Sequence, residues 1–250
     1  MKGLKKYTHL ERQKIIEEIT PQIQRKFGDN LIALAAQGSF ARNEDFDYSD
    51  LELIAFVKEM PEGFHGIGKI VDGLLIELIW TTREKYIAET FELNDMWYLS
   101  ASDKLLPIIN AKFISELSEY RTKNLKEKCL AEAKRHWHEV QESTAKTLNA
   151  IGAENRDGLP LVLFDMVRHF LISLSFLNQM PYTTFSRFVS EARNFLVKPL
   201  EFDDLLDLIV KGEYRDLPEL EKMIVSIFSQ FEKIFEDLGV ELYDKVIDFD

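Results

Sequence analysis

Two acidic residues, Asp50 and Glu52, lie two positions apart at the start of the apolar run DLELIAFV. In an extended strand, residues two positions apart project from the same face, so this spacing places the two carboxylates side by side. Carboxylates this close raise each other's pKa unless a cation lies between them, and hard oxygen ligands favour magnesium. The pair therefore indicates a magnesium site, although a lone D-x-E pair is more typical of the polar face of an edge strand.

A second group of residues, before this strand, is suited to binding phosphate. Gly38 and Ser39 follow the apolar run LIALAAQ and can begin a short helix whose free N–H groups attract anions. The glycine lets a phosphate approach the backbone, and Arg42, three residues on, carries a guanidinium that can bind two phosphate oxygens at once. The order G-S, then R, then D-x-E predicts a triphosphate site beside a metal site.

A third carboxylate, Glu77, lies in the run LLIELIW, whose other members are all apolar. An unpaired carboxylate buried in such a strand would be unfavourable, and a metal ion would relieve that cost. The alternative is a strand end that leaves Glu77 in water. Three carboxylates on two adjacent strands could hold two ions that orient a reaction at phosphate.

Taken together, these residues give the sequence a resemblance to the kanamycin (aminoglycoside) nucleotidyltransferase family, within the superfamily that has the polymerase-beta-type core. The similarity covers nearly the whole chain and includes KFGDNLIAL, GSFARNEDFDYSDLEL, the strand of the third carboxylate, HEVQESTAK and PYTTFSRFVSEA. It implies an α+β fold. An N-terminal nucleotidyltransferase domain, with a mixed sheet flanked by helices, would be followed by a C-terminal helical bundle.

The resemblance assigns roles to the residues described above. Those that match the family's metal-binding carboxylates are Asp50, Glu52 and Glu77. Those that match its nucleotide-phosphate site are Gly38, Ser39 and Arg42. The implied cofactor is Mg²⁺, as two ions, and the implied co-substrate is ATP.

Two further residues, Glu142 and Lys146, match the family's general base and its phosphate-binding lysine. They are four positions apart and so share one helical face, where an ordinary surface ion pair would be the alternative. In the family, the helical half of one subunit completes the active site of its partner. The resemblance therefore implies a homodimer with shared active sites.

The implied reaction is transfer of AMP from ATP to a hydroxyl of a small, cationic acceptor, an aminoglycoside antibiotic. His138 departs from the family, which has a carboxylate one turn before the base, so a lincosamide or another small hydroxylated molecule stays open as the acceptor. A protein adenylyltransferase, and a nucleotide-binding regulator without catalytic activity, stay open as well.

The elements that must position these residues follow from capping and apolar spacing. Thr8 and Glu11 form a capping-box pattern that predicts a first helix over residues 9–27. The runs predicted to be strands of one sheet are 31–37, 50–57 and 74–80. The runs predicted to be helices of the second half are 123–150, 160–178, 183–196 and 219–238. We expect a catalytic domain over 1–122 and a helical bundle domain over 123–250.

Composition and charge exclude some classes of partner and some structural features. The 250 residues are 46% hydrophobic and carry a net charge of -12, which argues against binding nucleic acid through its phosphates. The sequence has no apolar run long enough to cross a membrane and no signal-peptide pattern, so a cytoplasmic location is expected. The single cysteine, Cys129, excludes an internal disulfide.

Overall fold

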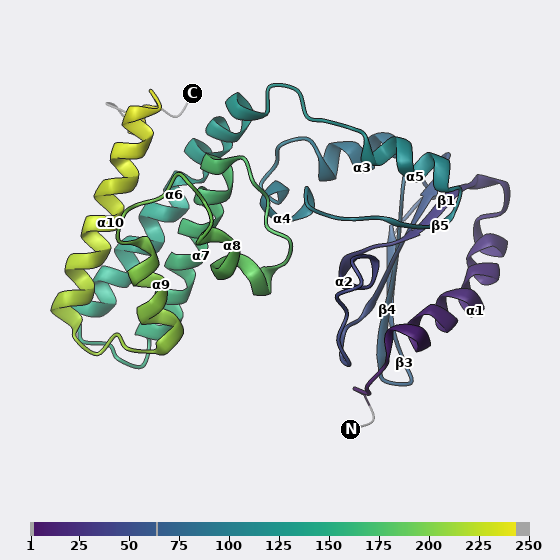
Figure 1. Cartoon of the computed structure of the whole chain (residues 1–250), viewed down its shortest axis with the longest axis horizontal. Helices are drawn as coiled ribbons and strands as arrows, with labels where there is room; N and C mark the ends of the chain where they lie inside the picture. Colours follow the sequence, from purple (N-terminus) through teal and green to yellow (C-terminus); the bar gives the residue numbers. More distant parts are fainter. Residues whose placement is uncertain (1–2, 64, 244–250) are drawn as a thin grey trace. The chain divides into compact units, whose positions relative to one another are not determined.

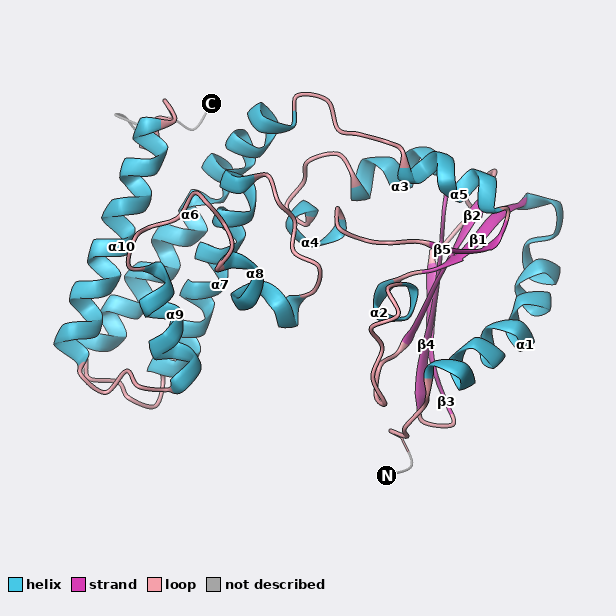
Figure 2. Ribbon diagram, in the orientation of Figure 1, coloured by secondary structure: helices cyan, strands magenta, loops and turns pink. Residues whose placement is uncertain are grey.

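The computed structural model describes residues 3–63 and 65–243, which form two compact units. The N-terminal unit extends to Glu92 and continues from Ser100 to Thr122, and the C-terminal unit comprises Leu93–Leu99 and the described residues from Lys123 onward. The first unit contains the sheet and the second is mainly helical, which confirms the predicted α+β class (Figures 1 and 2).

The N-terminal unit is built on a mixed five-stranded sheet with the strand order β3-β4-β2-β1-β5. The strands are β1 (Leu31–Ala36), β2 (Leu51–Val57), β3 (Gly66–Val71), β4 (Leu74–Thr81) and β5 (Leu106–Ile109). Strands β2 and β4 are parallel, and the other neighbouring pairs are antiparallel. The three predicted strands are β1, β2 and β4, whereas β3 and β5 were not predicted.

Helices cover both faces of this sheet, because alternate strand residues are apolar on each side. Helix α1 (His9–Phe27), capped at Thr8 by the predicted capping box, packs Ile16 and Ile23 on one face. The helices on the other face are α3 (Arg83–Thr90) and α5 (Ala111–Ser118), which bury Tyr86 and Leu117 against Phe56. The remaining helical segments are η1 (Gly28–Asn30) and α2 (Gly38–Ala41). Residues of β2 with even numbers therefore share the face of α3 and α5.

The C-terminal unit is a helical bundle with an aromatic core. Its long helices are α6 (Leu125–Gly152), α7 (Leu159–Asn178) and α10 (Leu217–Asp237), and its shorter ones are η2 (Phe185–Arg187), α8 (Phe188–Ala192) and α9 (Phe202–Lys211). Phe170 of α7 stacks on Phe231 of α10 with a ring-centroid distance of 4.8 Å. Trp97, at the start of α4 (Trp97–Ser100), stacks on Phe176 of α7, so this short segment packs with the bundle.

The continuous helix predicted over residues 183–196 is wrong. Only η2 and the five-residue α8 form there, and Thr184 is extended, with φ -163° and ψ 155°. The Glu191 side chain accepts a hydrogen bond of 2.8 Å from the Thr183 amide. Through this bond the Glu191 carboxylate of α8 holds the backbone at Thr183 and Thr184 in an extended conformation. The spacing of apolar residues gives no indication of such a bond.

The prediction that no apolar run is long enough to cross a membrane is wrong for helix α7, which has the length and the apolar composition of a membrane-crossing helix. However, 67% of its most apolar 18-residue window is buried inside the bundle. Such burial is typical of the central helix of a soluble protein, whose apolar surface is covered by its neighbours.

Candidate active site

Three carboxylates converge on one face of the sheet. Glu52 of β2 lies directly opposite Glu77 of β4 in the parallel pairing, and Asp50 immediately precedes β2. One oxygen from each of the three lies within 4.8 Å of the others, and all three residues are partly buried. Oxygen atoms at this spacing can bind a common divalent cation.

The carboxyl of Glu52 has a strongly raised pKa, of about 7. Burial is the largest cause, and repulsion from the negative charges of Asp50, Asp103 and Glu77 also raises the pKa, whereas Arg42 lowers it. A cation placed among the three carboxylates would offset this repulsion, so the donor set fits a magnesium ion.

The contribution of Glu52 to stability is expected to fall as the pH rises. Between the unfolded pKa of 4.5 and the folded pKa of about 7, the folded chain holds a proton that the unfolded chain has lost. Stability therefore decreases as the pH rises through this window. A magnesium ion held by these carboxylates would bind the ionised form of Glu52, so its binding should be about tenfold weaker one pH unit below the pKa.

This pH dependence can be measured by thermal unfolding with and without magnesium chloride. The rise in melting temperature on adding magnesium should be larger at about pH 8 than at about pH 6, because no proton need be displaced at the higher pH. An equal rise at both pH values would contradict the role of Glu52, and an unchanged rise in Asp50→Asn would contradict that of Asp50.

The residues predicted to bind phosphate lie beside these carboxylates. Gly38 begins α2 with φ +67°, and a Cβ added there would lie 1.8 Å from Oε2 of Glu52, so this position requires glycine. Ser39 is the next residue of the same short helix, and Arg42 ends it. Arg42 donates from Nε to Glu44 over 3.1 Å, and its Nη1 lies 3.8 Å from Oδ1 of Asp103. The helix therefore presents its first amide and a guanidinium near the three carboxylates.

Asp103 is a further acidic residue of this site, and it was not predicted from the sequence. Burial raises its pKa, while Arg42 and hydrogen bonds from the amides of Gly38 and Lys104 act in the opposite direction. Its carboxylate thus already contacts the amide and the guanidinium that were predicted to bind phosphate. The available signal was the isolated acid just before the short strand β5, itself not predicted.

Glu142 and Lys146 lie in the C-terminal unit, on one face of α6. Their side chains form an ion pair of 2.8 Å and are 58% and 57% exposed. The hydrogen bond from Lys146 lowers the pKa of Glu142. The structure thus brings the residues predicted to bind metal and phosphate together in one unit, and Glu142 and Lys146 together in the other.

A histidine pair links α6 to α7 one to two turns before Glu142. His136 Nε2 lies 3.1 Å from His169 Nδ1, and burial, followed by the proximity of His169, lowers the pKa of His136 to about 3. His138 points elsewhere, with Nε2 3.1 Å from Glu139. His169 was not predicted from the sequence, where its signal was a single histidine in a mostly apolar helical run.

The chain is similar to a family model, to named relatives and to a solved structure. The model of the KNTase C-terminal domain matches residues 115–241. Two relatives named aminoglycoside nucleotidyltransferase (4'), from Bacillus sp and Staphylococcus aureus, are each 24% identical over 248 residues, which cover 93% of this chain and 93% of each relative. The crystal structure of a nucleotidyltransferase-like protein from Exiguobacterium sibiricum 255-15 matches 89% of this chain and 75% of that one, with a TM-score of 0.47 and 12% identity.

Proposed function

Since the chain belongs to the KNTase C-terminal domain family and is a nucleotidyltransferase, we propose that it uses magnesium to transfer AMP from ATP to a hydroxyl group of a small molecule. The observation that carries the proposal is the convergence of Asp50, Glu52 and Glu77 beside Gly38 and Arg42. No step of such a reaction needs a covalent bond to the protein, so positioning and charge are the main requirements.

In this proposal the three carboxylates hold two magnesium ions. When bound, magnesium neutralises charge on the triphosphate and orients it for in-line displacement. The amide of Gly38 and the hydroxyl of Ser39 donate to phosphate oxygens, and Arg42 pairs with them through its guanidinium. These groups lower the repulsion between the triphosphate and the carboxylates of the protein.

Glu142 is the proposed general base. It takes the proton from the acceptor hydroxyl, whose oxygen bonds to the α-phosphorus of ATP while the bond from that phosphorus to pyrophosphate breaks. Lys146, one turn later on α6, is proposed to pair with phosphate charge when the nucleotide is bound. Following the family resemblance, we propose a homodimer in which Glu142 and Lys146 of one copy serve the carboxylates of the other.

An aminoglycoside is the acceptor we propose. Both full-length relatives carry aminoglycoside in their names. In this chain, Glu139, Glu142 and Asp165 expose carboxylates on adjacent turns of α6 and α7, with side chains 42%, 58% and 44% exposed. Such a surface suits the ammonium groups of a cationic sugar.

The test is release of pyrophosphate from labelled ATP with magnesium and a panel of acceptors. We expect release with at least one aminoglycoside. Release only with a lincosamide, another small hydroxylated molecule or a protein would move the assignment to that acceptor. ATP binding without release for any acceptor would contradict catalysis and favour a nucleotide-binding regulator.

Replacing Asp103 by asparagine is expected to strengthen ATP binding. The Asp103 carboxylate contacts Arg42 and the Gly38 amide, so it competes with phosphate for the same donors. Removing this one charge should lower the Kd for a non-hydrolysable ATP analogue by roughly fivefold, about 1 kcal/mol. Calorimetric titration with magnesium present measures the change.

The matched control is Asp72→Asn, which removes an acid that is 68% exposed and paired with Lys5. It should leave the Kd unchanged, because exposed ion pairs contribute little. An Asp103→Asn protein that binds the analogue no better than wild type would show that Asp103 does not compete with phosphate.

A further inference from the structure

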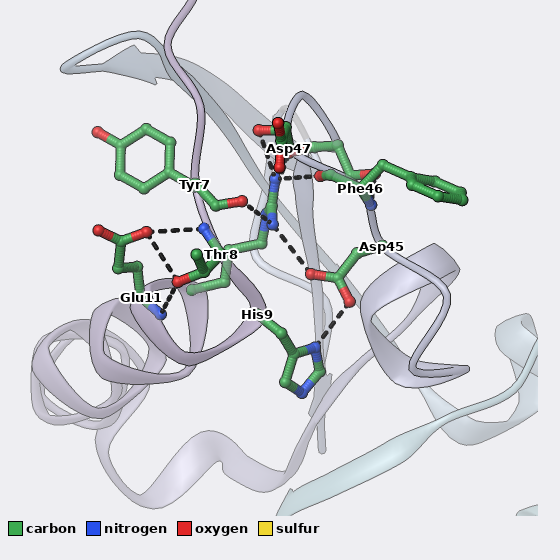
Figure 3. Close-up of polar contacts among 9 residues, drawn as sticks. Tyr7, Thr8, His9, Glu11, Asp45, Phe46 and Asp47 are labelled. Atoms are coloured by element: carbon green, nitrogen blue, oxygen red, sulfur yellow. Dashed lines mark hydrogen bonds and ion pairs between the residues drawn. The ribbon is translucent and has the colours of Figure 1, made fainter.

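Arg12 of α1 is a fully buried arginine whose guanidinium contacts the loop of residues 45–49 and the backbone of Tyr7. Four of these partners, Tyr7, Asp45, Phe46 and Asp47, are labelled in Figure 3. It donates from Nε and Nη2 to the carbonyl of Ser49, over 3.1 and 2.7 Å, and from Nη2 to the carbonyls of Phe46 and Asp47, over 2.8 and 3.2 Å. Its Nη1 donates to the Asp45 carboxylate over 2.9 Å and to the Tyr7 carbonyl over 2.8 Å. Every nitrogen of the guanidinium is therefore engaged.

The loop held in this way is residues 45–49, which lead directly into Asp50. Its two aromatic side chains do not anchor it, because Phe46 is 81% exposed and Tyr48 is 52% exposed. Within the loop, the Phe46 amide donates to Ser49 Oγ over 3.0 Å, and the Ser49 amide donates to the Phe46 carbonyl. The loop is therefore fixed mainly through its backbone, from the side of α1.

The contacts around Arg12 also extend to α2, the short helix that begins at Gly38. Asp45, whose side chain is 2% exposed, accepts from Arg12 and lies 2.7 Å from Nδ1 of His9. The His9 ring stacks on Phe40 of α2, with a centroid distance of 4.3 Å. The buried ion pair between Arg12 and Asp45 therefore connects α1 to the 45–49 loop, and His9 connects the same pair to α2. Both of these segments lie shortly before Asp50 and Glu52 in the sequence.

We propose that Arg12 is a positioning residue for the metal site: by fixing the carbonyls of residues 46–49, it sets the direction in which Asp50 leaves the loop. This inference rests on the proposed magnesium site at Asp50, Glu52 and Glu77. A guanidinium suits the role because its planar fork can bind several carbonyls in fixed directions, which an ammonium group cannot do. Arg12 acts through the loop and does not itself contact the nucleotide.

A purely structural role is the competing explanation, because loss of any buried ion pair lowers stability. The matched control is Ile23→Ala, a substitution on the same helix that leaves a cavity against the sheet, away from the 45–49 loop. Both Arg12→Gln and Ile23→Ala should lower the melting temperature.

The experiment is calorimetric titration of wild type and both variants with Mn²⁺ alone. Of these two variants, only Arg12→Gln should weaken Mn²⁺ binding, by about tenfold, which is the effect of removing a group that orients a metal ligand. A third variant, Arg12→Lys, should bind Mn²⁺ with an affinity between those of Arg12→Gln and wild type. Unchanged Mn²⁺ binding in Arg12→Gln would overturn the positioning role, and so would equal weakening in Ile23→Ala.

A folding defect and a missing metal site would each give a distinct result. If Arg12→Gln does not fold, Arg12→Lys carries the same test, because it keeps the positive charge but lacks the planar fork that binds the carbonyls of residues 46–49. Wild-type protein that binds no Mn²⁺ would contradict the magnesium site itself, whereas tight wild-type binding that Arg12→Gln leaves unchanged would contradict only the inference about Arg12.

Discussion

Replacing Asp50 by asparagine is expected to lower kcat by about a thousandfold or more. The substitution keeps the size of the side chain but removes one of three carboxylates whose oxygens lie within 4.8 Å of one another. Metal ions supply several kcal/mol of charge stabilisation in such reactions, and each 1.4 kcal/mol lost is about tenfold in rate. Steady-state release of pyrophosphate, with the best acceptor from the panel, measures the loss.

The control for this substitution is again Asp72→Asn, in the turn between β3 and β4, which should retain the activity of wild type. Stability supplies a second readout. Removing Asp50 also removes a charge that raises the pKa of Glu52, so the metal-free variant should be no less stable than wild type at neutral pH. A variant that is stable and still fully active would show that Asp50 is not a metal ligand.

Glu142→Gln has the second largest expected effect, a loss of about 10²–10⁴-fold in kcat, the range for removal of a general base. The amide cannot accept the proton of the acceptor hydroxyl, yet it keeps the shape of the side chain on α6. Mn²⁺ binding should be unchanged, because the proposed metal ligands are intact. Glu127→Gln, an exposed acid in the first turn of the same helix, is the matched control and should stay active.

Mixing the two inactive variants tests the shared active site. In a heterodimer of Asp50→Asn with Glu142→Gln, one composite site would have an intact carboxylate cluster from one copy and an intact base from the other. Part of the wild-type activity should therefore return. A verified heterodimer that remains inactive would rule out sites shared between subunits.

The strands that could be predicted from the sequence are those formed by nearly continuous apolar runs. The runs LIALAA and LELIAFV are bounded by polar residues or glycine and form β1 and β2. Strand β3 reads GIGKIV, with two glycines and mostly exposed residues, and β5 has four residues including a proline. Such strands form because a neighbouring strand offers hydrogen bonds to their backbone, and the local sequence carries little information about the position of that neighbour.

The same distinction applies to the candidate site, where local sequence patterns predict some residues and the tertiary fold alone reveals others. The adjacency of Asp50 and Glu52 follows from the two-residue period of a strand, and their proximity to Glu77 needs only that β2 and β4 pair. Asp103 and Arg12 could not be identified in this way. Each contacts partners more than 30 positions away in the sequence, so its role depends on the tertiary fold.

The most direct test of the central claim is the mass of the acceptor after incubation with enzyme, ATP and magnesium. Transfer of AMP predicts an aminoglycoside heavier by one adenylyl group, formed by wild type and absent with Asp50→Asn or with a metal chelator. An acceptor of unchanged mass with wild type, under conditions where the protein binds both ATP and the acceptor, would contradict the account.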